Sequence, residues 1–161
     1  MAWTTPTTVS AGDKLTSTMW NNQVAGNLSY LLSPNKGMII RNNNGDYSTT
    51  STSWVDVDAT NLSITITTYG GPVLVLAAML TGQTSGDTGG IDVTMDGTRI
   101  GEASTLGLVN ATNTYVPICT IVTPAAGSHT FKLQYRTTNA SYATIIRSNT
   151  YEVVTFAAIE L

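Results

Sequence analysis

The sequence predicts a mainly β protein, an antiparallel jelly-roll sandwich that follows an extended N-terminal arm and one short helix. Residues 35–161 alternate apolar and polar side chains over short segments that Gly, Asn and Asp turns interrupt. Residues 1–34 lack this alternation and place apolar residues at helical spacing instead. A chain of 161 residues has room for one domain with a substantial core. We therefore expect a docking and oligomerisation segment over 1–34 and a β head over 35–161.

The N-terminal segment predicts an arm and then a helix. Residues 2–12 are rich in Thr and contain Pro6, so they should be extended. Thr16 is suited to cap a helix that ends near Pro34. One apolar stripe follows the helix, formed by Trp20, Val24, Leu28 and Leu31. A lone helix cannot bury its own stripe, so we expect it to pack on copies of itself or on a larger assembly.

The rest of the chain predicts a succession of strands. Asp96-Gly97 is a strong hairpin signal between two of them. Ser128–Arg136 alternates regularly, with His129, Phe131, Leu133 and Tyr135 on one face. The expected strands are Gly37–Arg41, Ser53–Asp58, Asn61–Thr68, Pro72–Thr81, Ile91–Met95, Thr98–Glu102, Thr114–Thr123, Ser128–Thr137, Tyr142–Ser148 and Tyr151–Leu161.

Three of these strands are apolar on both faces. They are Val73–Leu80, Val116–Val122 and much of Val153–Ile159. A sandwich strand that is apolar on both faces has a second partner surface. We interpret that surface as an oligomer interface, which a jelly roll closed around a three-fold axis would supply.

Composition and charge exclude several classes of protein. Charged residues make up 11% of the chain, the net charge is −3 and the seven basic residues are scattered, which argues against nucleic-acid binding. We expect no secretory signal and no membrane insertion, because no apolar run approaches the ~20 residues that span a bilayer. Synthesis in a bacterial cytoplasm is the corresponding expectation. The single cysteine, Cys119, excludes an internal disulfide, and its apolar neighbours predict a small buried hydrophobe.

Two arrangements suggest nucleophilic catalysis, and we discount both. Gly86-Asp87-Thr88-Gly89-Gly90 looks like the nucleophile loop of trypsin-type proteases, but the single histidine, His129, follows it in the wrong order. A turn is the better interpretation. Cys119 and His129 could form a thiol–imidazole pair if their strands were hairpin neighbours. No third residue or oxyanion loop accompanies them, so we expect a packed cysteine, a hydrogen-bonded histidine and no enzyme activity.

No metal or cofactor site is predicted. The run Asn42-Asn43-Asn44-Gly45-Asp46 resembles a calcium loop, to which Asp56 and Asp58 could lend carboxylates. Ile40 occupies the first ligand position, however, and no Glu closes the loop. Asp56, Asp58, Asp92 and Glu102 are the remaining acids that a hydrolase could use, and nothing in their spacing marks them.

Aromatic side chains beside turns offer one alternative binding function. Tyr47, Tyr69 and Tyr142 are expected near loop tips, where they could contact a ligand such as a glycan. Packing across the sheets is the other interpretation for most of the aromatic residues.

Two segments resemble structural proteins of tailed bacteriophages. Trp3-Thr4-Thr5-Pro6, Gly12-Asp13-Lys14-Leu15-Thr16, Trp20-Asn21 and Asn27-Leu28 with Leu31 resemble the leader of small virion proteins. The run from Ala126 to Arg136, with Ala143-Thr144-Ile145 and Ala158-Ile159-Glu160-Leu161, is similar to the closing strands of phage jelly-roll heads of the TNF and C1q type.

This resemblance implies a non-enzymatic virion protein on the particle surface, with a trimeric head. The short arm favours a capsid decoration (cement or head-fibre) protein whose partners are its own copies and the major capsid protein or another virion protein. The residues expected to dock are Trp3, Pro6, Leu15, Trp20, Val24, Leu28 and Leu31. The alternative is a receptor-binding knob of a tail fibre or tail tip that recognises a host glycan or protein.

Overall fold

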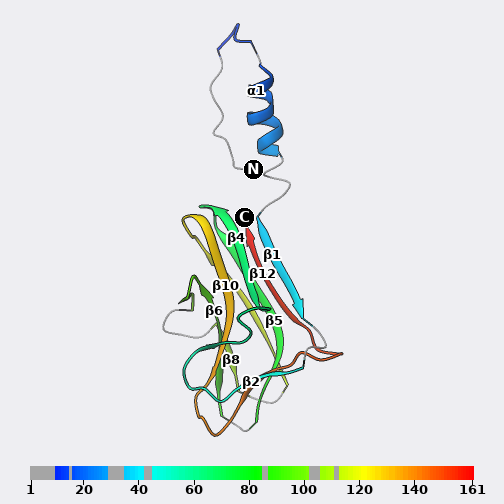
Figure 1. Ribbon diagram of the computed structural model, residues 1–161, viewed down its shortest axis with the longest axis vertical. Helices are drawn as coiled ribbons and strands as arrows, with labels where there is room; N and C mark the ends of the chain where they lie inside the picture. Colours follow the sequence, from blue (N-terminus) through cyan, green and yellow to red (C-terminus); the bar gives the residue numbers. More distant parts are fainter. Residues whose placement is uncertain are drawn as a thin grey trace. The chain divides into compact units, whose positions relative to one another are not determined.

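The computed structural model describes residues 10–14, 16–28, 35–41, 45–84, 87–101, 106–110 and 113–161. The chain forms two compact units, Met1–Asn35 and Lys36–Leu161. Each unit is described by itself below, and Figure 1 shows the elements of both.

The N-terminal unit contains the helix, which begins where the sequence predicts. Thr16 is extended, and its hydroxyl accepts a hydrogen bond from the Met19 N–H at 3.2 Å, so it caps α1 (Ser17–Trp20) as expected. The next turn, η1 (Asn21–Ala25), is a π-helix, and the described helix continues to Leu28. A regular α-helix was expected here. The Asn-rich sequence and Gly26 favour the α-helical ladder only weakly, which allows the wider turn.

Six antiparallel strands form the first sheet, sheet A. Its order is β1-β12-β5-β11-β2, and β9 pairs with the other edge of β5. These strands are β1 (Lys36–Arg41), β2 (Tyr47–Thr49), β5 (Val73–Gln83), β9 (Thr114–Val122), β11 (Thr144–Ile146) and β12 (Val154–Glu160). The long strand β5 pairs with β12, β11 and β9, and so organises the whole sheet.

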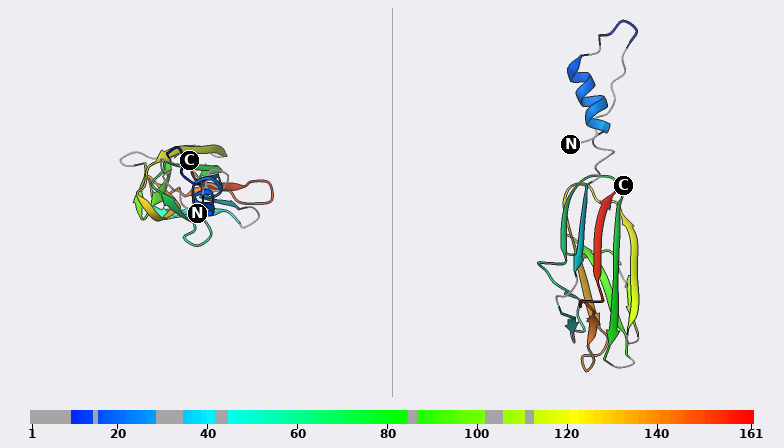
Figure 2. Two further views of the ribbon diagram at one scale, coloured as in Figure 1. Left: turned by 90° about the horizontal axis from the view of Figure 1, so that it is seen from above. Right: turned by 90° about the vertical axis from the view of Figure 1, so that its right-hand side faces the viewer.

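Sheet B lies against sheet A, and it is organised by β10. Its order is β3-β10-β6-β7, with β4 paired to β10 and β8 paired to β6. The strands are β3 (Val55–Asp56), β4 (Ser63–Tyr69), β6 (Gly89–Met95), β7 (Thr98–Arg99), β8 (Gly107–Val109) and β10 (Ala126–Thr137). Figure 2 shows the two layers of strands.

The strand order confirms the predicted antiparallel jelly roll. The four principal strands of sheet A run β1-β12-β5-β9, and those of sheet B run β4-β10-β6-β8, the order of two interlocked Greek keys. The buried core lies between the sheets, with Val75 and Phe156 from sheet A against Phe131 and Leu133 from sheet B. The alternation predicted for β10 is confirmed at Phe131, Leu133 and Tyr135, which are buried.

The turns and short strands differ more from expectation than the long strands do. The Asp96-Gly97 hairpin is confirmed: both residues have positive φ, and Met95 pairs with Thr98. Strands β2 and β8 were not predicted, because three residues are too few to establish an alternating pattern. Several predicted strands are shorter in the structure, notably Val55–Asp56 and Thr144–Ile146. Within the described residues no helix is long and apolar enough to cross a membrane.

Candidate interaction surfaces

The outward face of sheet A is apolar across four neighbouring strands. The strand register places Met38, Ala157, Leu76 and Cys119 in one row, from β1 across β12 and β5 to β9. The flanking rows are Ile159, Leu74 and Ile121 on one side, and Ile40, Thr155, Ala78 and Pro117 on the other, with Leu80 and Tyr115 beyond. We call these thirteen positions the apolar face of sheet A. They span roughly 15 by 20 Å at ordinary strand spacings.

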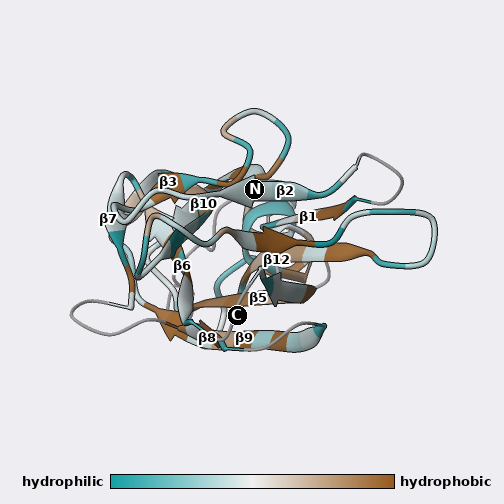
Figure 3. Ribbon diagram, turned by 90° about the horizontal axis from the view of Figure 1, so that it is seen from below, coloured by the Kyte–Doolittle hydropathy of each residue, from teal (hydrophilic) through white to brown (hydrophobic). Residues whose placement is uncertain are grey.

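Several side chains of this face are open to solvent in the single chain. Met38 is 67% exposed, Ile121 58% and Tyr115 68%, whereas the inward neighbours Val75 and Ile118 belong to the core. The brown stretches of β1, β12, β5 and β9 in Figure 3 mark the hydrophobic strands that carry it. In the described strands the only charge in these rows is Lys36, opposite Ile159. Contiguous apolar patches of this size commonly mark interaction sites.

The prediction that Cys119 is buried is wrong for the single chain, because its side chain is exposed. Cys119 pairs with Leu76 on the outward face, while Ile118 beside it points into the core. An apolar run does not reveal which of its alternate residues face inward when both sets are apolar. The thiol therefore lies within the apolar face of sheet A.

The helix of the N-terminal unit carries the expected apolar stripe. Trp20 is 51% exposed, Val24 42% and Leu28 53%. About half of each of these side chains is therefore open to solvent. The other residues expected to dock, Trp3, Pro6, Leu15 and Leu31, lie outside the described residues.

The three tyrosines expected near loop tips do not form one site. Tyr69 ends β4 opposite Ala126, the first residue of β10, whereas Tyr142 follows the far end of β10, roughly 35 Å of strand away. Tyr47 is a half-buried residue of β2 packed on the core. Burial raises the pKa of its phenol, and the nearby Asp58 carboxylate adds to that shift.

Tyr151 is the most exposed aromatic side chain described, and the sequence did not single it out. It is 90% exposed between β11 and β12. The Asn149 Oδ1 accepts hydrogen bonds from the N–H groups of Tyr151 and Glu152, at 2.9 and 3.3 Å, which fixes the turn. The Asn-Thr-Tyr sequence was a usable signal for an ordered turn ending on an aromatic residue.

A polar cluster occupies the outward face of sheet B. The Asp92 side chain is fully buried and accepts from Arg99 Nε at 2.7 Å and from the Gly101 N–H at 3.1 Å. The Arg99 guanidinium lies 4.1 Å from the centre of the Trp54 ring, and that of Arg136 lies 4.9 Å from it. The Asp92 carboxylate thus has a structural role, because it binds both Arg99 and the Gly101 N–H of this cluster.

The other acids considered for catalysis or metal binding also have structural partners. Asp56 accepts from Lys132 Nζ at 3.0 Å and from Gln134 Nε2 at 2.8 Å, and Asp58 accepts from the Asn61 N–H at 2.8 Å. Asp46 forms an ion pair with Arg147. Residues 42–44 of the supposed calcium loop, and Glu102, lie outside the described residues. Among those that are described, no three His, Cys, Asp or Glu side chains are close enough to hold a metal ion.

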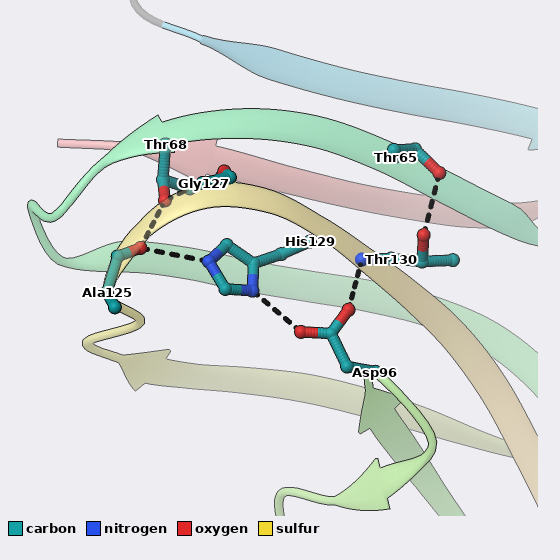
Figure 4. A network of polar contacts seen from close by, with 7 residues as sticks. All are labelled: Thr65, Thr68, Asp96, Ala125, Gly127, His129 and Thr130. Carbon is teal, nitrogen blue, oxygen red and sulfur yellow. Dashed lines mark hydrogen bonds and ion pairs between the residues drawn. The ribbon is translucent and has the colours of Figure 1, made fainter.

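His129 is hydrogen-bonded, as expected, and it is not paired with Cys119. Its Nδ1 lies 2.7 Å from Asp96 Oδ2, and its Nε2 lies 2.9 Å from the Ala125 carbonyl oxygen, as Figure 4 shows. The strands that carry Cys119 and His129 are in different sheets, since β9 pairs with β5 and β10 with β4, β3 and β6. The thiol–imidazole pair was conditional on a hairpin that does not form.

The protease-like loop also lacks the geometry of a nucleophile site. The Thr88 hydroxyl lies 3.1 Å from that of Thr138, and the Thr138 hydroxyl donates to Asp87 at 2.8 Å. These contacts hold the entry to β6 against the end of β10. The base of a trypsin-type site would be a histidine, and His129 is bonded to Asp96 and Ala125.

Comparisons with known proteins leave the family open. No protein-family profile and no curated protein matches the chain. Among solved structures, a sugar-binding protein described as the C-terminal domain of EclA is 14% identical, with a TM-score of 0.37 over 89% of this chain and 98% of that one. A pentameric capsid protein isolated from metagenomic phage sequences is 18% identical, with a TM-score of 0.26 over 96% and 80%. Both TM-scores lie below 0.5.

Proposed function

We propose that this protein is a non-enzymatic structural component of a tailed-phage virion, a homotrimer that decorates the capsid surface. The observation that carries the proposal is the apolar face of sheet A, which four strands build in register and which has a single charge in its rows. An apolar face with so little charge is best matched by an equally apolar partner surface. Copies of the same chain supply such a surface wherever the protein is made.

The number of copies in our proposal, three, rests on the resemblance of the closing strands to those of trimeric phage heads of the TNF and C1q type. A trimer would also bury Cys119, which lies in the central row.

Docking on the particle is assigned to residues 1–34. The stripe of Trp20, Val24 and Leu28 supports this role, because about half of each side chain is open to contact with a partner. Three such segments on one trimer would bind a capsid lattice with combined strength. A protein that binds only the assembled lattice also opposes its rupture by mass action.

The position of the protein on purified virions tests the proposal. With labelled protein and particle imaging, we expect many copies at regular positions over the head. A variant that lacks residues 2–32 should keep a folded β head and lose binding to particles. A few copies confined to the tail would contradict capsid decoration, and loss of the fold in the truncated variant would contradict the division of roles.

A receptor-binding knob is the second candidate, and the exposure of Tyr151 favours it. A fixed turn that presents a 90% exposed aromatic ring is suited to stacking on a sugar or packing on a receptor. In that case the isolated head should bind host cells saturably, and Tyr151→Ala should remove at least nine-tenths of this binding without unfolding the head. Tyr69→Ala and Tyr142→Ala test two further tyrosines in the same way. If the parent head and the three variants bind equally, none of these tyrosines contacts the receptor.

A further inference from the structure

Both nitrogen atoms of the His129 ring face hydrogen-bond acceptors. Nδ1 meets a carboxylate oxygen of Asp96 at 2.7 Å, and Nε2 meets the carbonyl oxygen of Ala125 at 2.9 Å. Neither acceptor can donate at neutral pH, because one is an ionised carboxylate and the other a backbone carbonyl. A neutral imidazole has one N–H and can satisfy one of the two. Only the imidazolium satisfies both.

The three groups come from different parts of sheet B. Asp96 lies in the turn between β6 and β7, Ala125 lies in the connection that leads from β9 into β10, and His129 is on β10 itself. The Asp96 turn is also fastened to Thr130, whose N–H donates to Asp96 Oδ1 at 2.8 Å and whose carbonyl accepts from the Asp96 N–H at 2.9 Å. The carbonyl of Ala125 accepts in addition from the Thr68 hydroxyl at 2.8 Å. Figure 4 shows the contacts of the Asp96 carboxylate, the His129 ring and the Ala125 carbonyl together.

The charge that acts on the imidazole is that of Asp96. On β10 the nearest basic residue, Lys132, lies on the opposite face of the strand and is paired with Asp56. On β4, which packs beside β10, the titratable residue is Tyr69, opposite Ala126. Glu160, a buried acid of sheet A, accepts hydrogen bonds from the N–H groups of Tyr69 and Gly71.

We propose that His129 is a protonation-controlled clasp that ties the β6–β7 turn to the corner between β9 and β10. When the ring loses its proton, Nδ1–H can stay bonded to Asp96, but the lone pair of Nε2 then faces the Ala125 carbonyl. Two acceptors 2.9 Å apart repel each other, so the corner around Ala125 moves away from the ring. Thr68 continues to hold that carbonyl, which limits the change to a local opening.

The geometry fixes the direction of the pH dependence. The bond to Asp96, and then the bond to Ala125, raise the pKa of His129 above its ordinary value. A raised pKa in the folded state means that the clasp stabilises fully below about pH 6.5, and that this stabilisation is lost as pH rises through the folded pKa. The Thr130 N–H, and then His129, lower the pKa of Asp96, so the acid limit of the clasp lies below the usual range of that carboxyl.

Ring resonances followed by NMR test the clasp in the full chain, and the assignment is unambiguous because the sequence has one histidine. We expect His129 to titrate above pH 6.5, and amide protection at residues 125–128 to fall through the same range. Asp96→Asn should lower the His129 pKa and shift the loss of protection with it. Thr65→Val is the matched control, because it removes the hydroxyl contact with Thr130 at 2.9 Å and leaves both acceptors of the ring in place.

Stability measurements supply an independent test. The urea midpoint of the parent protein should fall between pH 6 and pH 9 by more than that of His129→Gln, which cannot gain a charge. A His129 that titrates at or below 6.5, or that titrates identically in Asp96→Asn, would overturn the proposal. So would an identical pH dependence of the parent protein and His129→Gln.

Discussion

Replacing Ile121 with Glu is expected to convert the assembled protein into single chains of 17.0 kDa while leaving the jelly roll folded. Ile121 is 58% exposed in the single chain, so the carboxylate is solvated there. In the proposed trimer the same carboxylate would be transferred from water into an apolar contact, which costs several kcal/mol for each copy. Analytical ultracentrifugation should give three times the chain mass for the parent protein and the single-chain mass for the variant.

Thr67→Glu is the matched control, since it places the same charge on an exposed strand position of sheet B. It should leave the mass unchanged. The thiol of Cys119 provides a second measurement that does not depend on mass. A thiol reagent should modify Cys119 slowly in the parent protein and at least tenfold faster in Ile121→Glu. Equal masses and equal thiol reactivity in the three proteins would mean that copies do not associate through sheet A.

Asp92→Ala is expected to lower the free energy of unfolding by about 3 kcal/mol. The substitution removes a fully buried carboxylate that pairs with Arg99 and accepts from the Gly101 N–H, and so removes the ion pair of the guanidinium beside Trp54. Chemical denaturation followed by Trp fluorescence measures the change, and the environment of Trp54 should alter as well.

Asp56→Ala removes an acid from the same face of sheet B, and it is the control for this prediction. Asp56 and Lys132 are both partly exposed, so their pair contributes about 0–1 kcal/mol after screening by solvent. Burial raises the pKa of Asp56, but the hydrogen bonds from Gln134 and Lys132 outweigh it and the net shift is downward. Equal losses of stability in the two variants would show that burial of Asp92 contributes nothing beyond an ordinary surface pair.

Much of the sandwich could be predicted because the alternation of polar and apolar residues identifies the buried face of a long strand such as β10. In β10 the polar residues Lys132 and Gln134 alternate with buried Phe131, Leu133 and Tyr135, so both the strand and its orientation follow from the sequence. In β9 the apolar residues are on both faces. The strand could be predicted there, but the outward position of Cys119 could not, because it depends on the register with β5.

The polar contacts were less predictable because they join residues that are distant in the chain. Asp92 and Arg99 are seven residues apart, across the predicted Asp96-Gly97 hairpin, but only the fold brings Trp54 to this pair. The buried carboxylate of Glu160 is similar: it accepts hydrogen bonds from Tyr69 and Gly71, about ninety residues earlier. Short-range patterns carry no information about such partners. Tyr47, expected at a loop tip, was misplaced for the same reason, since it belongs to a strand that forms only beside β11.

The pairing of β1 with β12 has a consequence for how the chain reaches its native state. Lys36 pairs with Ile159 and Arg41 pairs with Val154, so the ladder of β1 joins segments more than one hundred residues apart. Contacts this distant in sequence close large loops and slow the folding reaction. At ordinary rates of translation, β1 leaves the ribosome on the order of ten seconds before its partner strand exists.

During that interval Met38 and Ile40 are not yet paired with β12. The apolar face of sheet A, through which copies could associate, is therefore incomplete. Association between chains should therefore follow completion of the sheet, and nascent chains should need protection by chaperones more than mature ones do. The apolar face of sheet A is thus complete only after β12 has been synthesised and has paired with β1.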